Sequence, residues 1–390
     1  MSAAEATRTR VPVAGSAIDF ARTPFTVIWE VTRACDLRCV HCRADAQRQR
    51  HPLELTTSEG CALLDQVKEL GSPVFVFTGG DPLRRADLFD LLAYASSIGV
   101  AAAVTPSGTP LLTPAAVRKF RELGVHRMAL SLDGPDAASH DGFRQQPGSY
   151  ALTMRALYAA RDCGLPTQVN TTVTRRNVLL LHEIAQRVAE VEATTWSAFF
   201  LVTTGRARAS DQLEAEEFES VFAFLYDLSQ RVPFTVRTTA APHYRRFVLQ
   251  RLREEKRKGS ALAPPAAEHE RPTDLPRAPK GVTDGNGLVF ISHTGDVFPS
   301  GFLPLRAGNV RAQPLATIYR SSALFQALRD PSRLEGKCRD CEFVRVCAGS
   351  RARAYAETGS FLASEPRCSY LPPAWKRRHG LAEPAPNPAA

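Results

Sequence analysis

The sequence lacks any long apolar segment. No run of eighteen or more apolar residues occurs among the 390 residues, and the stretch from Met1 to Arg10 is polar with charges of both signs. A transmembrane helix needs about 20 mostly apolar residues, and an export signal has a basic start followed by an apolar stretch. The sequence therefore predicts a cytoplasmic protein with no membrane partner.

Cysteine is missing from the whole stretch between Cys163 and Cys338, although the chain has nine cysteines in all. Seven of the nine fall into two clusters within a large chain that has no export signal. Disulfide frameworks belong mainly to small secreted domains, so metal ligation is the better interpretation of both clusters. Cys61 and Cys163 lie outside the clusters and are expected to be small buried hydrophobic residues.

The chain also lacks a recognisable nucleic-acid-binding motif. Its formal net charge of +9 is carried mostly by arginine, but no basic helix with interleaved aromatic residues accompanies it. The charge predicts an anionic substrate such as a carboxylate or a phosphate, with plain solubility as the alternative. No nucleic-acid partner is expected.

Hydrophobic patterning predicts an α/β fold. Hydrophobic residues make up 44% of the chain and charged residues 23%, so an ordinary core can form. From residue 25 to about 230, short β-branched or aromatic runs alternate with amphipathic stretches, as in βα units around a parallel sheet. The expected strands are Phe25–Val31, Val74–Thr78, Val100–Thr105, Arg127–Leu132, Thr167–Val173 and Trp196–Val202.

Capping residues predict where two of the helices begin and end. One is expected to begin at Thr57 or Ser58 and to end at Gly71. Another is expected to begin at Thr113-Pro114 and to end at Gly124.

Changes in composition divide the chain into five expected segments. A dense charge run followed by Ala, Pro and Glu predicts a flexible linker, and a Pro- and Ala-rich end predicts a disordered tail. The segments are an N-terminal segment (1–24), a partial (β/α)6 TIM-like barrel (25–250), the linker (251–280), a second module (281–372) and the tail (373–390). The second module is expected to start with a hairpin of residues 288–291 and 297–298, with its turn at Thr294-Gly295.

Three cysteines follow the first predicted strand, with three and then two residues between them: Cys35, Cys39 and Cys42. Three thiolates on one loop can hold three irons of a four-iron cluster and leave the fourth iron without a protein ligand. A closed structural site would need a fourth cysteine, and none lies nearby in the sequence. The loop therefore predicts a catalytic [4Fe-4S] cluster with one open iron.

The stretch Trp29–Cys42 resembles the three-cysteine loop of the radical S-adenosylmethionine (SAM) superfamily, and the resemblance extends from residue 25 to about residue 202. It implies that the open iron chelates the amino and carboxylate groups of SAM. An electron then breaks SAM to give a 5′-deoxyadenosyl radical, which abstracts hydrogen from the substrate. The resemblance also implies a reducing partner such as ferredoxin or flavodoxin.

The same resemblance implies SAM contacts at later strand ends, where ligands gather in a barrel. Gly79-Gly80-Asp81-Pro82 looks like the family's turn that receives the methionine ammonium, although such a turn is also a common βα connection. His41 occupies a family position near the adenine, with a loop residue packed beside the cluster as the alternative. The other implied contacts, which can equally be interior hydrogen-bonding residues, are Ser107, Ser131, Asp133, Asn170 and Thr172.

The second cysteine group has four members, which suit either structural zinc or a fully ligated iron–sulfur cluster. They are Cys338, Cys341, Cys347 and Cys368. The region 295–368 resembles the SPASM extension of radical SAM enzymes, which usually carries two auxiliary clusters. Ser300 and Ser350 stand near positions where ligands of one auxiliary cluster are expected, and serine is a poor substitute for thiolate. We therefore predict one auxiliary [4Fe-4S] cluster, held by the four cysteines.

Two stretches, Glu30–Cys35 and Phe290–Pro304, look most like those of enzymes that trim tetrapyrrole side chains in haem biosynthesis. Such enzymes abstract hydrogen from a propionate and release carbon dioxide, so the resemblance implies oxidative decarboxylation of an anionic substrate. Arg206 and Arg208 follow the sixth predicted strand and are expected at the barrel mouth, where guanidinium groups can bind a carboxylate. Solvated surface charge is the alternative for both.

Two other functions stay open. Radical enzymes with this extension often modify a ribosomally made peptide, but the residues before Phe25 are too few for an independent leader-binding domain. A separate protein can supply that domain. A non-enzymatic scaffold stapled by zinc would use the same two cysteine groups.

Overall fold

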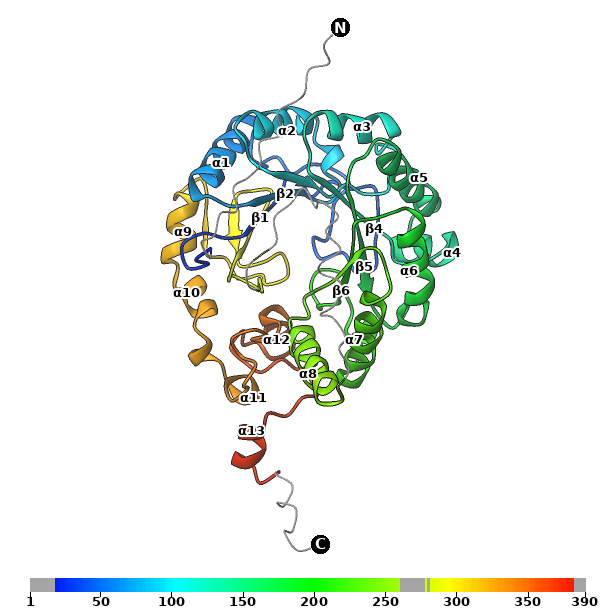
Figure 1. Ribbon diagram of the computed structural model, residues 1–390. Coiled ribbons are helices and arrows are strands. Elements are labelled where there is room, and N and C mark those ends of the chain that lie inside the picture. Colours follow the sequence, from blue (N-terminus) through cyan, green and yellow to red (C-terminus); the bar gives the residue numbers. More distant parts are fainter. Residues whose placement is uncertain (1–17, 260–277, 279–280, 382–390) are drawn as a thin grey trace, which may run out of the picture.

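The computed structural model describes residues 18–259, 278 and 281–381. In this part of the chain, one sheet runs in the order β10-β9-β8-β1-β2-β3-β4-β5-β6-β7, and helices surround it (Figure 1). The predicted α/β class is confirmed. The strands are β1 (Thr26–Glu30), β2 (Val74–Thr78), β3 (Ala102–Val104), β4 (Arg127–Ser131), β5 (Thr167–Val173), β6 (Thr195–Phe200), β7 (Thr235–Thr239), β8 (Leu288–Ile291), β9 (Asp296–Phe298) and β10 (Gly308–Asn309).

Helices connect successive strands and cover the outer face of the curved sheet (Figure 1). None of the described helices is both long and apolar enough to cross a membrane. The α-helices are α1 (Thr57–Leu70), α2 (Leu88–Ser97), α3 (Pro114–Glu122), α4 (Ala137–Arg144), α5 (Ser149–Asp162), α6 (Leu181–Glu190), α7 (Ala215–Ser229), α8 (Tyr244–Arg257), α9 (Leu315–Ser321), α10 (Ala323–Arg329), α11 (Gly336–Arg339), α12 (Arg351–Thr358) and α13 (Pro373–Arg378), and the 3-10 turns are η1 (Pro82–Arg84), η2 (Val178–Leu180), η3 (Ala209–Asp211) and η4 (Pro331–Arg333).

Strands β1 to β7 pair in parallel in sequence order, so their carboxyl ends meet at one end of the barrel. Trp29 on β1 is fully buried against Phe75 and Phe77 of β2. Helix α1 begins after Thr56, whose side chain accepts from the Glu59 N–H in a capping box, and it ends at Gly71 in the left-handed conformation. Local sequence signals therefore determine where an element begins and ends, and packing in the core determines which of its faces points inward.

The sequence pattern misses β7. Its residues, Thr235–Thr239, pair with β6 in the register Thr195↔Thr235, but none of them is buried. A strand without a buried apolar face carries little of the hydrophobic signal that strand prediction depends on.

The second module shares its sheet with the barrel. Strand β8 pairs with β1 in parallel, in the register Thr26↔Leu288 to Trp29↔Ile291. The predicted hairpin is confirmed as β8 and β9, which pair antiparallel through Phe290↔Phe298. Gly295 in the turn has a φ of +85°. The module is thus a continuation of the barrel wall and not a separate body.

Two predicted disordered segments contain helix. Helix α8 continues to Arg257, seven residues into the predicted linker, because Tyr226 of α7 donates to Glu255 at 2.8 Å and anchors it. The first residues of the predicted tail form α13, which begins at a proline and is closed by the stacked rings of Trp375 and His379. Residues 1–17, most of the predicted linker (260–277 and 279–280) and the end of the predicted tail (382–390) lie outside the described residues.

Candidate active site

The first cysteine group lies on the loop that follows β1. Cys35 and Cys39 are buried, and Cys42 is half-buried. The Leu37 N–H donates to Cys35 Sγ at 3.4 Å, and Arg144 Nη1 donates to Cys39 Sγ at 3.5 Å. The spacing in the sequence thus becomes three thiols at the carboxyl end of a central strand.

The loop after β6 packs directly on this cysteine loop. A Cβ placed on Gly205, which has a φ of +60°, would lie 2.3 Å from the Cys42 carbonyl oxygen. The next N–H along the chain, that of Arg206, donates to the same oxygen at 3.0 Å. Glycine is therefore required here, since a side chain would displace the loop that carries Cys42.

A cavity of about 190 Å³ adjoins the three thiols, at the carboxyl ends of the parallel strands. Ligands of barrel enzymes bind at this end. Apolar residues of the stretch 199–202 and Phe302 form part of its wall. The predicted site residues that line it are Cys35, Cys39, His41, Cys42, Gly79, Gly80, Ser107, Ser131, Asn170, Thr172 and Arg206.

Three predicted residues lie outside the cavity lining: Asp81, Asp133 and Arg208. The buried Asp81 carboxylate accepts from the Leu83 N–H at 3.1 Å and from Thr109 Oγ1 at 2.8 Å. Burial raises the pKa of Asp81 to about 6, although these hydrogen bonds oppose the rise. Asp81 therefore supports the glycine turn from the side away from the cavity. Arg208 is exposed to solvent.

Asp133 reaches the cavity through a residue that the sequence analysis missed. Its buried carboxylate accepts from the Thr172 N–H at 2.7 Å and forms an ion pair with Arg144. Arg144, the last residue of α4, lines the cavity beside Cys39. No motif marks Arg144, because only the packing of α4 brings it to the site.

His41 presents a neutral aromatic surface to the cavity. The centre of its ring lies 4.7 Å from that of Phe143, and within the described residues its Nδ1 has no hydrogen-bond partner. Burial, and then the charge of Arg144, lower the pKa of His41 well below its usual value. An uncharged ring is suited to stacking on a flat heterocycle, as its expected place near the adenine requires.

The chemistry of the thiols fits an iron–sulfur cluster. Burial raises the pKa of Cys35 to about 12 and also raises the pKa of Cys39. Such thiols stay protonated until a cation binds their thiolates. Three soft donors around one cavity suit a cluster that leaves one iron open.

The second cysteine group surrounds one small cavity, which all four of its thiols line. The Glu365 N–H donates to Cys338 Sγ and the Gly349 N–H to Cys347 Sγ, both at 3.3 Å. Burial raises the pKa of Cys341 to about 11. Within the described residues, no three His, Cys, Asp or Glu side chains lie close enough together to hold a single metal ion. The support for multi-iron clusters comes instead from the residue type, because both groups consist of cysteine thiols, the donors that iron–sulfur clusters prefer.

Ser300 and Ser350, which stand near expected ligand positions of another auxiliary cluster, are buried and serve the backbone. Ser350 Oγ accepts from the Arg353 N–H at 3.2 Å and caps α12. Ser300 Oγ accepts from the Phe302 N–H at 3.3 Å. Both hydroxyls thus contact the backbone of their own segments.

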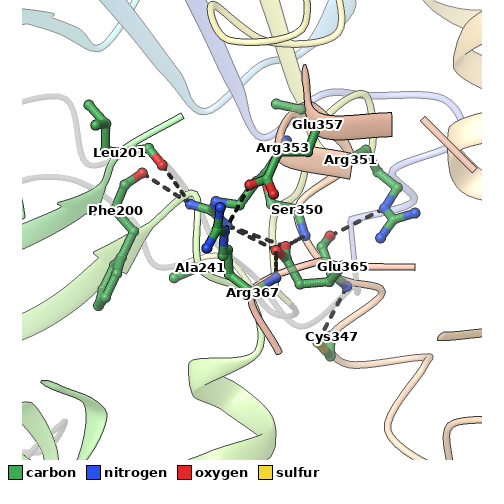
Figure 2. Close-up of polar contacts among 12 residues, drawn as sticks. Phe200, Leu201, Ala241, Cys347, Ser350, Arg351, Arg353, Glu357, Glu365 and Arg367 are labelled. Atoms are coloured by element: carbon green, nitrogen blue, oxygen red, sulfur yellow. Dashed lines mark hydrogen bonds and ion pairs between the residues drawn. The ribbon is translucent and has the colours of Figure 1, made fainter. Parts of the chain in front are cut away.

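A buried ion pair ties the second cysteine group to the barrel (Figure 2). Arg353 Nη1 lies 3.3 Å from the Glu365 carboxylate, and both residues are fully buried. Nη2 of Arg353 donates to the carbonyl oxygens of Phe200 and Leu201, at 3.2 and 3.1 Å. Because Phe200 and Leu201 line the larger cavity and the Glu365 N–H reaches Cys338, the network fixes one site relative to the other.

Comparison with known proteins identifies two regions of the chain. The model of the radical SAM superfamily matches residues 29–191, and that of an iron-sulfur cluster-binding domain, SPASM, matches residues 284–342. Cys347 and Cys368 lie beyond the second match.

Two relatives are similar over most of the chain. An AdoMet-dependent heme synthase of Nitratidesulfovibrio vulgaris is 42% identical, over 89% of this chain and 92% of its own. Another, from Methanosarcina barkeri, is 38% identical, over 91% of this chain and 99% of its own. Among solved structures, Streptococcus suis SuiB bound to S-adenosylmethionine shares the fold, with a TM-score of 0.68 at 14% identity, over 90% of this chain and 78% of SuiB.

Proposed function

The chain belongs to the radical SAM superfamily, and we propose on this premise that it oxidatively decarboxylates propionate side chains of an iron tetrapyrrole. It is an enzyme that uses a [4Fe-4S] cluster and SAM, with auxiliary iron–sulfur chemistry in its SPASM domain. We assign the first cluster to Cys35, Cys39 and Cys42, and one auxiliary cluster to the four cysteines of the second group.

One observation carries the choice of substrate: the thiols of the first group share their cavity with arginines and with an apolar wall. Nη2 of Arg206 is shielded from solvent and has no hydrogen-bond partner in the part of the chain that the structure describes. A tetrapyrrole offers a matching surface, with a broad apolar macrocycle and anionic propionates. The names of the two heme synthases support the same substrate class.

The proposed reaction balances as follows. A cluster held by Cys35, Cys39 and Cys42 would supply the electron that cleaves SAM, and the cleaved SAM would remove one hydrogen atom from the propionate carbon next to the ring. Carbon dioxide leaves, a vinyl group forms and one further electron must depart. The second cysteine group is the proposed place for its acceptor.

The protein's own residues supply position and shielding. Arg206 orients a carboxylate of the substrate, and the His41 ring offers a flat surface to the adenine. Arg144 positions Cys39 by donating to its Sγ. Ser107 donates to the Gly80 carbonyl at 2.9 Å and keeps the glycine turn beside Cys35. Ser131, Asn170 and Thr172 are the proposed polar contacts of SAM, with Gly79 and Gly80.

We place the enzyme in the cytoplasm, where thiols stay reduced, and we propose ferredoxin or flavodoxin as its reductant. Peptide modification was the alternative substrate class. The likeness to SuiB concerns the fold alone, and the relatives at 42% and 38% identity are heme synthases.

The direct experiment is anaerobic incubation of the reconstituted enzyme with SAM, dithionite and iron coproporphyrin, followed by mass spectrometry. Loss of carbon dioxide and two hydrogens for each converted propionate is expected, together with 5′-deoxyadenosine. Cys35→Ala, Cys39→Ala and Cys42→Ala should each abolish both products. An unchanged porphyrin in the presence of active SAM cleavage would exclude the proposed substrate.

Iron and acid-labile sulfide content test the second assignment separately. Cys338→Ala or Cys368→Ala should lose roughly four irons per chain and keep SAM cleavage. Zinc without sulfide in the wild-type protein would instead favour a structural metal site.

A further inference from the structure

The two stretches that resemble tetrapyrrole enzymes meet in space. Glu30 ends β1, and His293 follows β8, the parallel neighbour of β1. His293 Nδ1 lies 2.9 Å from Glu30 Oε1 across 263 residues of sequence, and both side chains are buried. Arg43, directly after Cys42, completes the group with Nη1 at 3.1 Å from Glu30 Oε2.

We propose that Arg43 binds a substrate carboxylate, and that Glu30 and His293 are positioning residues that hold its guanidinium in the reaction cavity. The inference rests on the proposed function and names the residues that recognise its substrate. Arg43 lines the cavity that adjoins the three thiols.

The guanidinium of Arg43 is held on several sides. Besides the ion pair with Glu30, it lies 4.4 Å from the centre of the Phe290 ring. Gly301 leaves room for it, because a Cβ at that position would lie 2.9 Å from Arg43 Nε. The side chain remains 20% exposed, toward the cavity that it lines. A guanidinium fixed in this way loses little freedom when it binds.

The charge of the group also suits this role. Burial tends to raise the pKa of Glu30, but Arg43 and the hydrogen bond from His293 outweigh it, and the pKa lies below its usual value. The carboxylate is thus ionised and occupies one edge of Arg43. A guanidinium has five N–H donors, so a second carboxylate can bind another edge as a fork.

Arg206 lines the same cavity from the loop after β6, which packs on the cysteine loop. Its Nη1 lies 3.7 Å from Asp45, and its Nη2 has no hydrogen-bond partner among the described residues. Each of the two arginines pairs with one carboxylate of the protein, and a guanidinium keeps further N–H donors. A substrate that carries several propionates can bind both of them.

The test compares iron coproporphyrin with its tetramethyl ester, in which the carboxylates are neutral. In Arg43→Gln, loss of a charge-assisted hydrogen bond should weaken binding of the acid by about tenfold or more, measured by titration of the porphyrin absorbance. Binding of the ester should stay unchanged, so the preference for acid over ester should fall. SAM cleavage without porphyrin is measured on the same samples, so that damage to the first cluster is distinguished from lost carboxylate binding.

Further variants separate positioning from folding. Glu30→Gln should weaken acid binding less than Arg43→Gln, and the double variant, which leaves no unpaired buried carboxylate, should bind the acid as weakly as Arg43→Gln alone. Arg48→Gln, at an exposed arginine nearby, is the matched control and should change nothing.

An Arg43→Gln protein that cleaves SAM normally and keeps the wild-type preference for the acid would overturn the inference. A wild-type enzyme that neither binds nor converts the acid would overturn the proposed function, and this inference with it.

Discussion

Asp81 illustrates how a residue in a familiar motif can act indirectly. The glycines before it line the reaction cavity, but its carboxylate turns away and accepts from Thr109 on the loop after β3. A carboxylate in so buried a place, without a cation paired to it, is costly to ionise. Its role in the fold should therefore depend on pH.

Asp81→Asn should stabilise the apoprotein near neutral pH. The pKa of Asp81 is raised to about 6 in the folded protein, against 3.8 as its ordinary value. The stability that protonated Asp81 contributes is thus fully present below pH 3.8 and is lost as the pH rises through 6. An asparagine does not undergo this loss, so its advantage should grow across that window to at most about 3 kcal/mol.

Urea unfolding of both apoproteins between pH 4.5 and 7.5 measures this difference. Asp136→Asn is a control of opposite sign. Hydrogen bonds from the Ser139 N–H and hydroxyl lower the pKa of Asp136 below 3.8. Asp136 is therefore ionised throughout this pH range, and its replacement should cost the same amount of stability at every pH. A constant difference between Asp81→Asn and wild type at every pH would contradict the assignment.

At this scale, spacing in the sequence predicts residues that act as a local set, and it misses those that tertiary packing delivers. The three cysteines of the first loop lie within eight residues, so their pattern is visible in the sequence. Arg144 comes from the end of α4, and the partner of Glu30 lies 263 residues away. Neither relation leaves a periodic or spaced signal.

At the scale of elements, Arg353 joins α12 to the end of β6 and forms a buried ion pair with Glu365. Breaking a buried ion pair leaves an uncompensated charge, which costs about 3–5 kcal/mol. Arg353→Met should therefore lower the free energy of unfolding by that amount. The double variant Arg353→Met/Glu365→Gln should recover most of it, because glutamine is neutral and still accepts from the Ser350 N–H, which donates to Glu365 at 2.7 Å.

The half-exposed Arg311–Glu59 pair is the matched control, since it also joins distant parts of the chain. Arg311→Met should cost less than about 1 kcal/mol, as for other solvent-exposed pairs. Denaturant unfolding of the three variants decides the case. If the double variant were no more stable than Arg353→Met, the buried charge would not be the cause of the loss.

The sequence predicts the bounds of an element accurately where local residues determine them, and poorly where tertiary contacts do. Strands β2 and β5 have the predicted bounds, because a β-branched residue stands at each end of both strands. Strand β7 pairs only with β6 in the described sheet and lacks a buried face, so its sequence resembles a loop. The last turns of α8 depend on Tyr226 of α7, a contact that no local pattern reveals.

At the scale of the whole molecule, the cysteine-rich second module completes the barrel wall. Strand β8 covers the edge of β1, and Tyr319 of α9 donates to the Phe20 carbonyl ahead of β1 at 2.6 Å. The sequence predicts two modules from the change in composition after residue 250. It does not predict that they share one sheet, because strand pairing between distant segments is not encoded in either one alone.

A fragment of residues 1–280 should therefore fail to fold, although it contains all three cysteines of the first group. Loss of β8 would open the backbone edge of β1, and parallel strands are normally buried on both faces and paired at both edges. The fragment would also lose the Arg353 contacts to the end of β6. We expect it to aggregate and to bind no four-iron cluster on reconstitution, as gel filtration and iron analysis would measure.

A chain ending at residue 372, which loses the short helix α13, is the control and should retain both properties. A monomeric 1–280 fragment that bound a cluster and cleaved SAM would mean that the barrel folds without its last wall. In that case the second module would serve the auxiliary site alone. Since β8 and His293 both come from that module, the positioning of Arg43 should also fail in any fragment that lacks it. If the fragment fails as expected, the substrate site and the auxiliary site both depend on the second module, and the two modules fold as one unit.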